Sequence, residues 1–136
     1  MMAARGFLDL PDSTAEKADV TLLPLPFEGT VSYGKGTAGG PAAILEASRQ
    51  VETWDEETRF DLENLAFHWA AEVTPGDNEN SGAYLDRVRE AACTIKREGS
   101  IIAGVGGEHS ITTPLAIAAM GKNDLSGLTV VQLDAH

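Results

Sequence analysis

Two histidines and one aspartate stand where they could bind a metal ion. His109 follows the pair Gly106-Gly107, and Asp134 and His136 lie two residues apart. In extended backbone, residues i and i+2 point to the same side, so this carboxylate and this imidazole can face one point. Two imidazoles and a carboxylate suit a divalent transition metal such as Mn, Fe, Zn or Ni. The three residues therefore predict metal chemistry, although a histidine taken singly is more often structural or solvated.

Apolar runs that precede these residues predict buried strands, and periodic segments predict helices between them. Strands are expected over 20–27, 65–73, 100–105 and 128–133, and helices over 42–51, 81–98 and 110–120. Strands that alternate with helices predict an α/β fold around a parallel sheet. Ligands bind beyond the carboxyl ends of the strands in such sheets, and the candidate metal ligands fall at those ends.

Two motifs taken together resemble the signature motifs of the ureohydrolase family, which contains the arginases and agmatinases. The first is VGGEHSIT, which begins at Val105, and the second is LDAH over residues 133–136. The segment PFEGTVSYGKGTAGGPAAILEAS, over residues 26–48, looks like the agmatinase branch. The resemblance runs from about Val20 to His136. It implies an arginase-like three-layer fold, with a parallel sheet and helices on both faces.

The resemblance also implies a metal centre. His109 would bind one Mn ion, His136 the other, and Asp134 would bridge the two. Ureohydrolases hold a hydroxide between two Mn ions, and it attacks the guanidinium carbon of the substrate to release urea and an amine. Two cations lower the pKa of a shared water, which yields a nucleophile at neutral pH.

The sequence departs from the family pattern at its last residue. The second family motif continues with an aspartate two residues beyond the histidine that matches His136, and further ligands and catalytic groups come from later segments. Residues 1–136 therefore resemble the N-terminal portion of a single ureohydrolase domain that ends after the fourth predicted strand. Either the natural protein is longer, or the chain is an inactive fragment or an interaction module.

The substrate class follows from the same resemblance. Agmatine, hydrolysed to putrescine and urea, is the leading candidate, while guanidinobutyrate, arginine and formiminoglutamate remain alternatives. The family usually forms trimers or hexamers, so a homo-oligomer is expected. Specificity for the far end of the substrate depends on loops, and the resemblance assigns no substrate contact to Glu28, Ser32 or Tyr33.

Composition limits the partners. The 136 residues carry a net charge of −11 and are 43% hydrophobic. Such a chain favours a small cationic substrate over nucleic acid or an anionic membrane. The N-terminus has no apolar core of signal-peptide length, and Cys93 is the single cysteine. A cytoplasmic protein is therefore expected.

One rival motif and two other polar residues need an explanation. The run GKGTAG over residues 34–39 matches a dinucleotide-binding fingerprint, but six residues separate it from Phe27, whereas the fingerprint belongs in a tight turn directly after the strand. A flexible loop at the mouth of a pocket is the preferred interpretation. His68 is expected to be a strand or packing histidine. Glu108 adjoins His109 and is expected to point elsewhere, in a supporting or helix-terminal role. The acidic run 52–57 is expected to be a solvated face.

Overall fold

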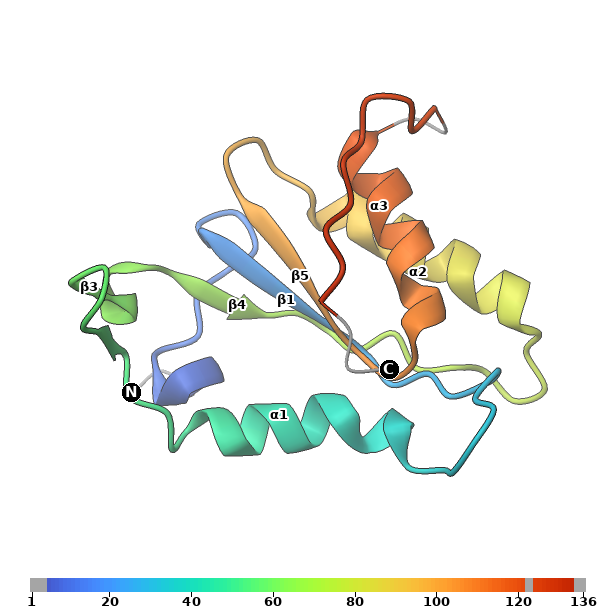
Figure 1. Cartoon of the computed structure of the whole chain (residues 1–136), viewed down its shortest axis with the longest axis horizontal. Helices are drawn as coiled ribbons and strands as arrows, with labels where there is room; N and C mark the ends of the chain where they lie inside the picture. The colour runs from blue at the N-terminus through green and yellow to red at the C-terminus, as the bar shows by residue number, and fades with distance from the viewer. Residues whose placement is uncertain (1–4, 122–123, 134–136) are drawn as a thin grey trace.

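Three parallel strands form the central sheet of the computed structural model, which describes residues 5–121 and 124–133 (Figure 1). Strand β1 (Val20–Leu25) lies between β4 (Phe67–Trp69) and β5 (Ile101–Gly106). The register of β1 and β5 runs from Val20 opposite Ile101 to Leu25 opposite Gly106. Because the pairing is parallel and unbroken, the carboxyl ends of β1 and β5 lie side by side.

Helices cover both faces of this sheet. Helix α1 (Gly40–Ser48) and the short 3-10 helix η1 (Phe7–Asp9) lie on one side. Helices α2 (Ser81–Ile95) and α3 (Thr112–Met120) pack against each other on the opposite side, as Figure 1 shows. The predicted α/β fold with a parallel sheet and helices on both faces is confirmed.

Side-chain alternation along β1 builds a hydrophobic core on each face. Leu22 packs on one face with Leu8 of η1, Phe67 and Val105. Leu23 packs on the other face with buried side chains of α2, of α3 and of the residue directly before α3, which are Tyr84, Val88, Ala92, Ala118 and Ile111. Full burial of one large apolar side chain contributes roughly 1.5–3 kcal/mol, so the β1 alternation commits the strand to one register.

Helix α2 follows its predicted apolar face closely but ends earlier than residue 98. Asn80 caps its N-terminus, where the Asn80 side chain accepts a 3.0 Å hydrogen bond from the Ala83 amide. At the other end, Lys96 adopts an extended conformation, with ψ of 128°. The Lys96 ammonium donates to the Ala119 carbonyl at 2.6 Å, so this residue joins α2 to α3 instead of extending the helix.

The predicted strand over residues 128–133 is wrong. Residues 128–133 form no strand and do not pair with β5. Val130, Val131 and Leu133 are 64%, 81% and 96% exposed. An apolar run becomes a strand only when its backbone groups find a neighbouring edge. Here the segment after α3 returns beside that helix toward the carboxyl end of the sheet (Figure 1).

A small antiparallel hairpin, which the sequence patterns did not predict, carries the acidic run. Strands β2 (Trp54–Asp55) and β3 (Phe60–Asp61) pair there, followed by the 3-10 helix η3 (Leu62–Asn64). The Asp55 carboxylate accepts hydrogen bonds from the Glu57 amide at 3.0 Å and the Thr58 hydroxyl at 2.5 Å. The predicted solvated face is confirmed, because residues 55–57 are exposed.

None of the helices in the described ranges is long and apolar enough to cross a membrane.

Candidate active site

The turn that carries His109 is pressed against the end of β1. β5 leads through Gly107 and Glu108 into the 3-10 helix η4 (His109–Ile111), which continues into α3. The Gly107 amide donates to the Leu25 carbonyl at 3.3 Å, and the Glu108 amide donates to the Phe27 carbonyl at 3.0 Å. A Cβ atom on Gly107 would lie 2.1 Å from the Phe27 carbonyl oxygen, so only glycine fits at this point. The GG pair therefore places His109 beside the carboxyl end of β1.

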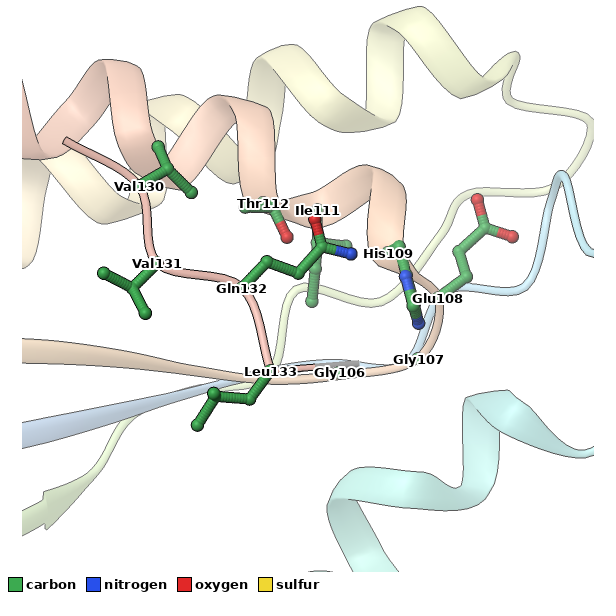
Figure 2. A pocket seen from close by; sticks show the side chains of 10 residues that line it. All are labelled: Gly106, Gly107, Glu108, His109, Ile111, Thr112, Val130, Val131, Gln132 and Leu133. Atoms are coloured by element: carbon green, nitrogen blue, oxygen red, sulfur yellow. The ribbon is translucent and has the colours of Figure 1, made fainter. Parts of the chain in front are cut away.

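A cavity of about 460 Å³ opens at this turn, and Figure 2 shows the side chains around it. His109 and Thr112 line one side, and residues 130–133 line the other. The Gln132 side chain extends toward η4 in Figure 2. The segment after α3 therefore runs past the predicted metal ligand His109, although it is not a strand.

The other two predicted ligands, Asp134 and His136, lie outside the described residues. Leu133, the residue directly before Asp134, lines the same cavity as His109. Within the described part of the chain, no three His, Cys, Asp or Glu side chains gather closely enough to hold a metal ion. The metal site therefore stays a prediction.

The surroundings of His109 are compatible with a metal ligand. Its imidazole is exposed rather than packed in the core, and it lines both the 460 Å³ cavity and a second cavity of about 330 Å³. Imidazole is a usual ligand of Mn and Zn, and the chain continues from the cavity wall at Leu133 into a carboxylate and a second imidazole. The donor types fit the implied ion.

Glu108 points away from His109, as predicted from their adjacency (Figure 2). Glu108 as a residue is only 9% exposed. It accepts a hydrogen bond from the Thr30 amide at 2.9 Å, one from the Thr30 hydroxyl, and one from the Ser110 hydroxyl at 2.6 Å. Burial by itself raises the pKa of Glu108, but the hydrogen bonds from Ser110 and Thr30 outweigh it and the net pKa lies below the ordinary value. Glu108 is therefore a buried anion that joins two segments far apart in the sequence.

The segment that Glu108 reaches is the glycine-rich loop, residues 28–40. Inside this loop, the Glu28 carboxylate accepts hydrogen bonds from the Gly36 amide at 2.8 Å and the Ala38 amide at 3.1 Å. These two bonds lower the pKa of Glu28. Gly34 and Gly36 have φ angles of 74° and 112°, which side-chain-bearing residues rarely adopt. The loop is therefore folded on itself by its own carboxylate.

The second cavity, of about 330 Å³, lies between the glycine-rich loop and the His109 turn. Thr30, Ser32, Tyr33 and Thr37 line it from the loop, and His109 is among the residues that line it from the turn. The Tyr33 side chain is 98% exposed. The preferred interpretation of this segment as a loop at the mouth of a pocket agrees with this geometry.

The positions of the 34–39 glycine motif and of His68 in the fold decide between the interpretations given to them. The 34–39 glycine motif begins in a loop and ends in the 3-10 helix η2 (Thr37–Gly39), and α1 begins only at Gly40. The tight strand-to-helix turn of a dinucleotide site is therefore absent from this described region. His68 lies in β4, and its Nδ1 atom is 3.0 Å from the Ser13 carbonyl oxygen, which confirms a packing role. Sequence patterns gave no sign that Thr30 contacts Glu108, because the pair are 78 positions apart.

The fold and this site define a member of a known family. The model of the arginase family matches residues 18–136, and the chain belongs to that family.

The chain is similar in sequence to ureohydrolases and agmatinases of other organisms. The chain is 35% identical over 123 residues to the N(1)-aminopropylagmatine ureohydrolase of Synechocystis sp., covering 88% of this chain and 40% of the relative. It is also 35% identical over 121 residues to the agmatinase of Bacillus subtilis, covering 89% of this chain and 41% of the relative. The chain therefore spans about 40% of the length of these curated relatives.

Solved structures agree on the fold. A hypothetical agmatinase from Burkholderia thailandensis superimposes with a TM-score of 0.73 at 24% identity, over 87% of this chain and 38% of that one. A Trypanosoma cruzi formiminoglutamase solved with Mn²⁺ superimposes with a TM-score of 0.68 at 20% identity, over 79% of this chain and 37% of that one. At this identity the similarity concerns the fold alone.

Proposed function

We propose that the protein is a manganese-dependent amidinohydrolase that hydrolyses agmatine to putrescine and urea. Residues 1–136 are the N-terminal portion of its single ureohydrolase domain. The observation that supports this most directly is the placement of His109, which follows the VGG run at the end of β5 and lines the cavity that residues 130–133 also line. That arrangement brings the first family motif close to Leu133, which is the first residue of the second motif.

Each predicted ligand has a separate role in the proposal. His109 would hold one Mn ion, His136 would hold the other, and Asp134 would be a ligand shared by both. Bound manganese would activate water toward the guanidinium carbon. The cavity between the glycine-rich loop and the His109 turn receives the rest of the substrate, and the net charge of −11 attracts its cationic groups. The protein acts in the cytoplasm as a homo-oligomer, a trimer or a hexamer.

A second substrate deserves equal testing. The Synechocystis relative is named for N(1)-aminopropylagmatine and is as similar to this chain as the Bacillus subtilis agmatinase, at 35% identity each. Both substrates present the same guanidinium group, so the same chemistry serves either. They differ only in the length and charge of the chain beyond the four-carbon part.

The first experiment determines the intact mass and the metal content of the purified natural protein. Urea release is then measured with added Mn for agmatine, N(1)-aminopropylagmatine, guanidinobutyrate, arginine and formiminoglutamate. The proposal expects about two Mn per chain, a mass well above 14.4 kDa, and a kcat/KM highest for agmatine. A kcat/KM highest for N(1)-aminopropylagmatine would replace agmatine with the second candidate.

Two results would contradict the proposal. A protein of 14.4 kDa without stoichiometric metal would indicate an inactive fragment or an interaction module. A metal-loaded protein that prefers guanidinobutyrate, arginine or formiminoglutamate would retain the amidinohydrolase chemistry but overturn the assignment of agmatine.

A further inference from the structure

Thr30 and Glu108 form a contact that joins the glycine-rich loop to the turn carrying His109, and Glu108 is buried there. The Glu108 carboxylate accepts from both the amide and the hydroxyl of Thr30. A buried carboxylate is costly unless hydrogen bonds compensate it, and here those bonds come from Thr30 and Ser110. Ser110 lies on the same turn as Glu108, so only the share of this compensation that comes from Thr30 depends on the position of the loop.

The loop is held at three points along its length. Thr30 binds Glu108 near its start, and the Glu28 carboxylate binds the Gly36 and Ala38 amides in its middle. At its end, Gly40 approaches the sheet so closely that a Cβ atom there would lie 2.8 Å from the Gly106 carbonyl oxygen. Of these three points, only the contact of Thr30 with Glu108 uses a side chain from the His109 turn.

We propose that Glu108 is a positioning residue that holds the glycine-rich loop against the His109 turn and so keeps the 330 Å³ cavity between them formed. The inference rests on the proposed function in that this cavity receives the part of the substrate beyond the guanidinium group. Loss of the contact would then loosen the wall that carries Ser32 and Tyr33 while leaving His109 on its own turn. Substrate binding would suffer more than the chemical step.

Loop position is tested without any assay of activity. Lys35 is an exposed trypsin site within the loop, and Lys17 is an exposed site outside it. Thr30→Val keeps the shape of the side chain and removes the hydroxyl, while Glu108→Gln removes the charge. Cleavage after Lys35, followed by mass spectrometry, should accelerate about tenfold in either variant, because a lost charge-assisted hydrogen bond shifts local opening by about that factor. Cleavage after Lys17 should stay unchanged.

Matched variants separate this role from a general loss of structure. Thr58→Val removes a similar hydroxyl-to-carboxylate hydrogen bond on the exposed hairpin, from Thr58 to Asp55, and should not affect Lys35. Thr30→Ser retains the hydroxyl and should restore the slow cleavage. The double variant Thr30→Val/Glu108→Gln should accelerate cleavage by less than the product of the two single accelerations, because both changes weaken the bond between the Thr30 hydroxyl and the Glu108 carboxylate.

Kinetics supply the second measurement. In the natural protein with Mn, Thr30→Val should raise KM for agmatine about tenfold and change kcat less than about threefold, whereas Thr58→Val should change neither. The inference would be overturned if a folded Thr30→Val variant were cleaved after Lys35 at the same rate as the unaltered protein. It would also be overturned if Thr58→Val accelerated this cleavage as much as Thr30→Val. A fall in kcat with KM unchanged would also overturn it. If the unaltered protein releases no urea, the proposed function fails, while the cleavage measurement still decides whether Glu108 holds the loop.

Discussion

The backbones of Gly107 and Phe27 lie in direct contact at the carboxyl end of the sheet. A Cβ atom built on Gly107 would come within 2.1 Å of the Phe27 carbonyl oxygen and 2.6 Å of the Phe27 nitrogen. Both are backbone atoms of the chain leaving β1, so no side-chain rotation can relieve the overlap. This close approach sets the distance between the glycine-rich loop and the turn that carries His109.

Gly107→Ala should therefore destabilise the protein by about 1–3 kcal/mol or more, because forcing extra volume into a packed backbone contact costs that amount. The measurement is the free energy of unfolding from denaturant titration. Gly39→Ala is the matched control, since nothing lies within 4 Å of a Cβ atom there. The free energy of unfolding of the Gly39→Ala variant should stay within about 0.5 kcal/mol of the value for the unaltered protein. Equal stability of the two variants would show that the Gly107 contact can relax.

Tyr84→Phe should cost roughly 1–2 kcal/mol of stability, because it leaves a buried carbonyl without its hydrogen bond. The Tyr84 hydroxyl donates to the Val73 carbonyl at 2.9 Å, and the residue is fully buried against Phe27. Tyr33→Phe removes the hydroxyl of a side chain that is 98% exposed and should change little. Thermal or denaturant unfolding of both variants measures the difference, and similar losses would contradict the assignment.

The same tyrosine predicts an alkaline loss of stability. Burial raises the pKa of Tyr84 from 10.0 to about 12. The neutral phenol is therefore favoured in the folded state, so its contribution to stability is full below pH 10 and is lost as pH rises through about 12. Unfolding free energies between those two pH values should fall more steeply for the unaltered protein than for Tyr84→Phe. Parallel curves for the two proteins would refute the raised pKa.

An ion pair at the start of α2 predicts a loss of stability in acid. The Arg87 side chain first, and then the Gly76 amide, lower the pKa of Glu79 from 4.5 to about 2. Arg87 donates to both Glu79 oxygens, at 2.8 and 2.6 Å. Because the pKa of Glu79 is lowered in the folded state, the ion pair contributes to folding stability above pH 4.5, and this contribution disappears as pH falls through about 2.

Glu79→Gln should therefore lower the unfolding midpoint at neutral pH, and the difference should vanish as the pH approaches about 2. Glu98→Gln, on an exposed residue after α2, is the control and should leave the midpoint unchanged throughout. A Glu79→Gln difference that persists at the acid end would mean that the ion pair is not its cause.

Substitution of the predicted ligand tests the metal site directly. In the natural protein, His109→Ala should lower bound Mn per chain and reduce urea release by at least about 100-fold, because the remaining donors can no longer complete one ion's coordination. His68→Asn is the matched histidine control, since His68 lies in β4 and its ring contacts the Ser13 carbonyl. The Mn content of the His68→Asn variant should not change. A chelator should abolish urea release from the unaltered protein, and Mn should restore it. Full Mn content in His109→Ala would exclude His109 as a ligand.

Much of the fold could be predicted because it rests on local periodicity. The apolar run over 20–27 and the three- and four-residue spacing in 81–98 correspond to β1 and α2, since burial of one face decides both elements. The run over 128–133 is just as apolar but forms no strand. A strand depends on a neighbouring edge as well as on its own residues, and the order β4-β1-β5 leaves the segment outside the sheet.

The sequence by itself determined the α/β class, the buried strand β1 and the motif that carries His109, because side-chain type and spacing alone account for them. Only the tertiary structure decided that Thr30 binds Glu108 and that Gly107 touches Phe27. Those contacts join residues about 80 positions apart, where no local pattern acts and only the parallel register of β1 and β5 brings the chains together.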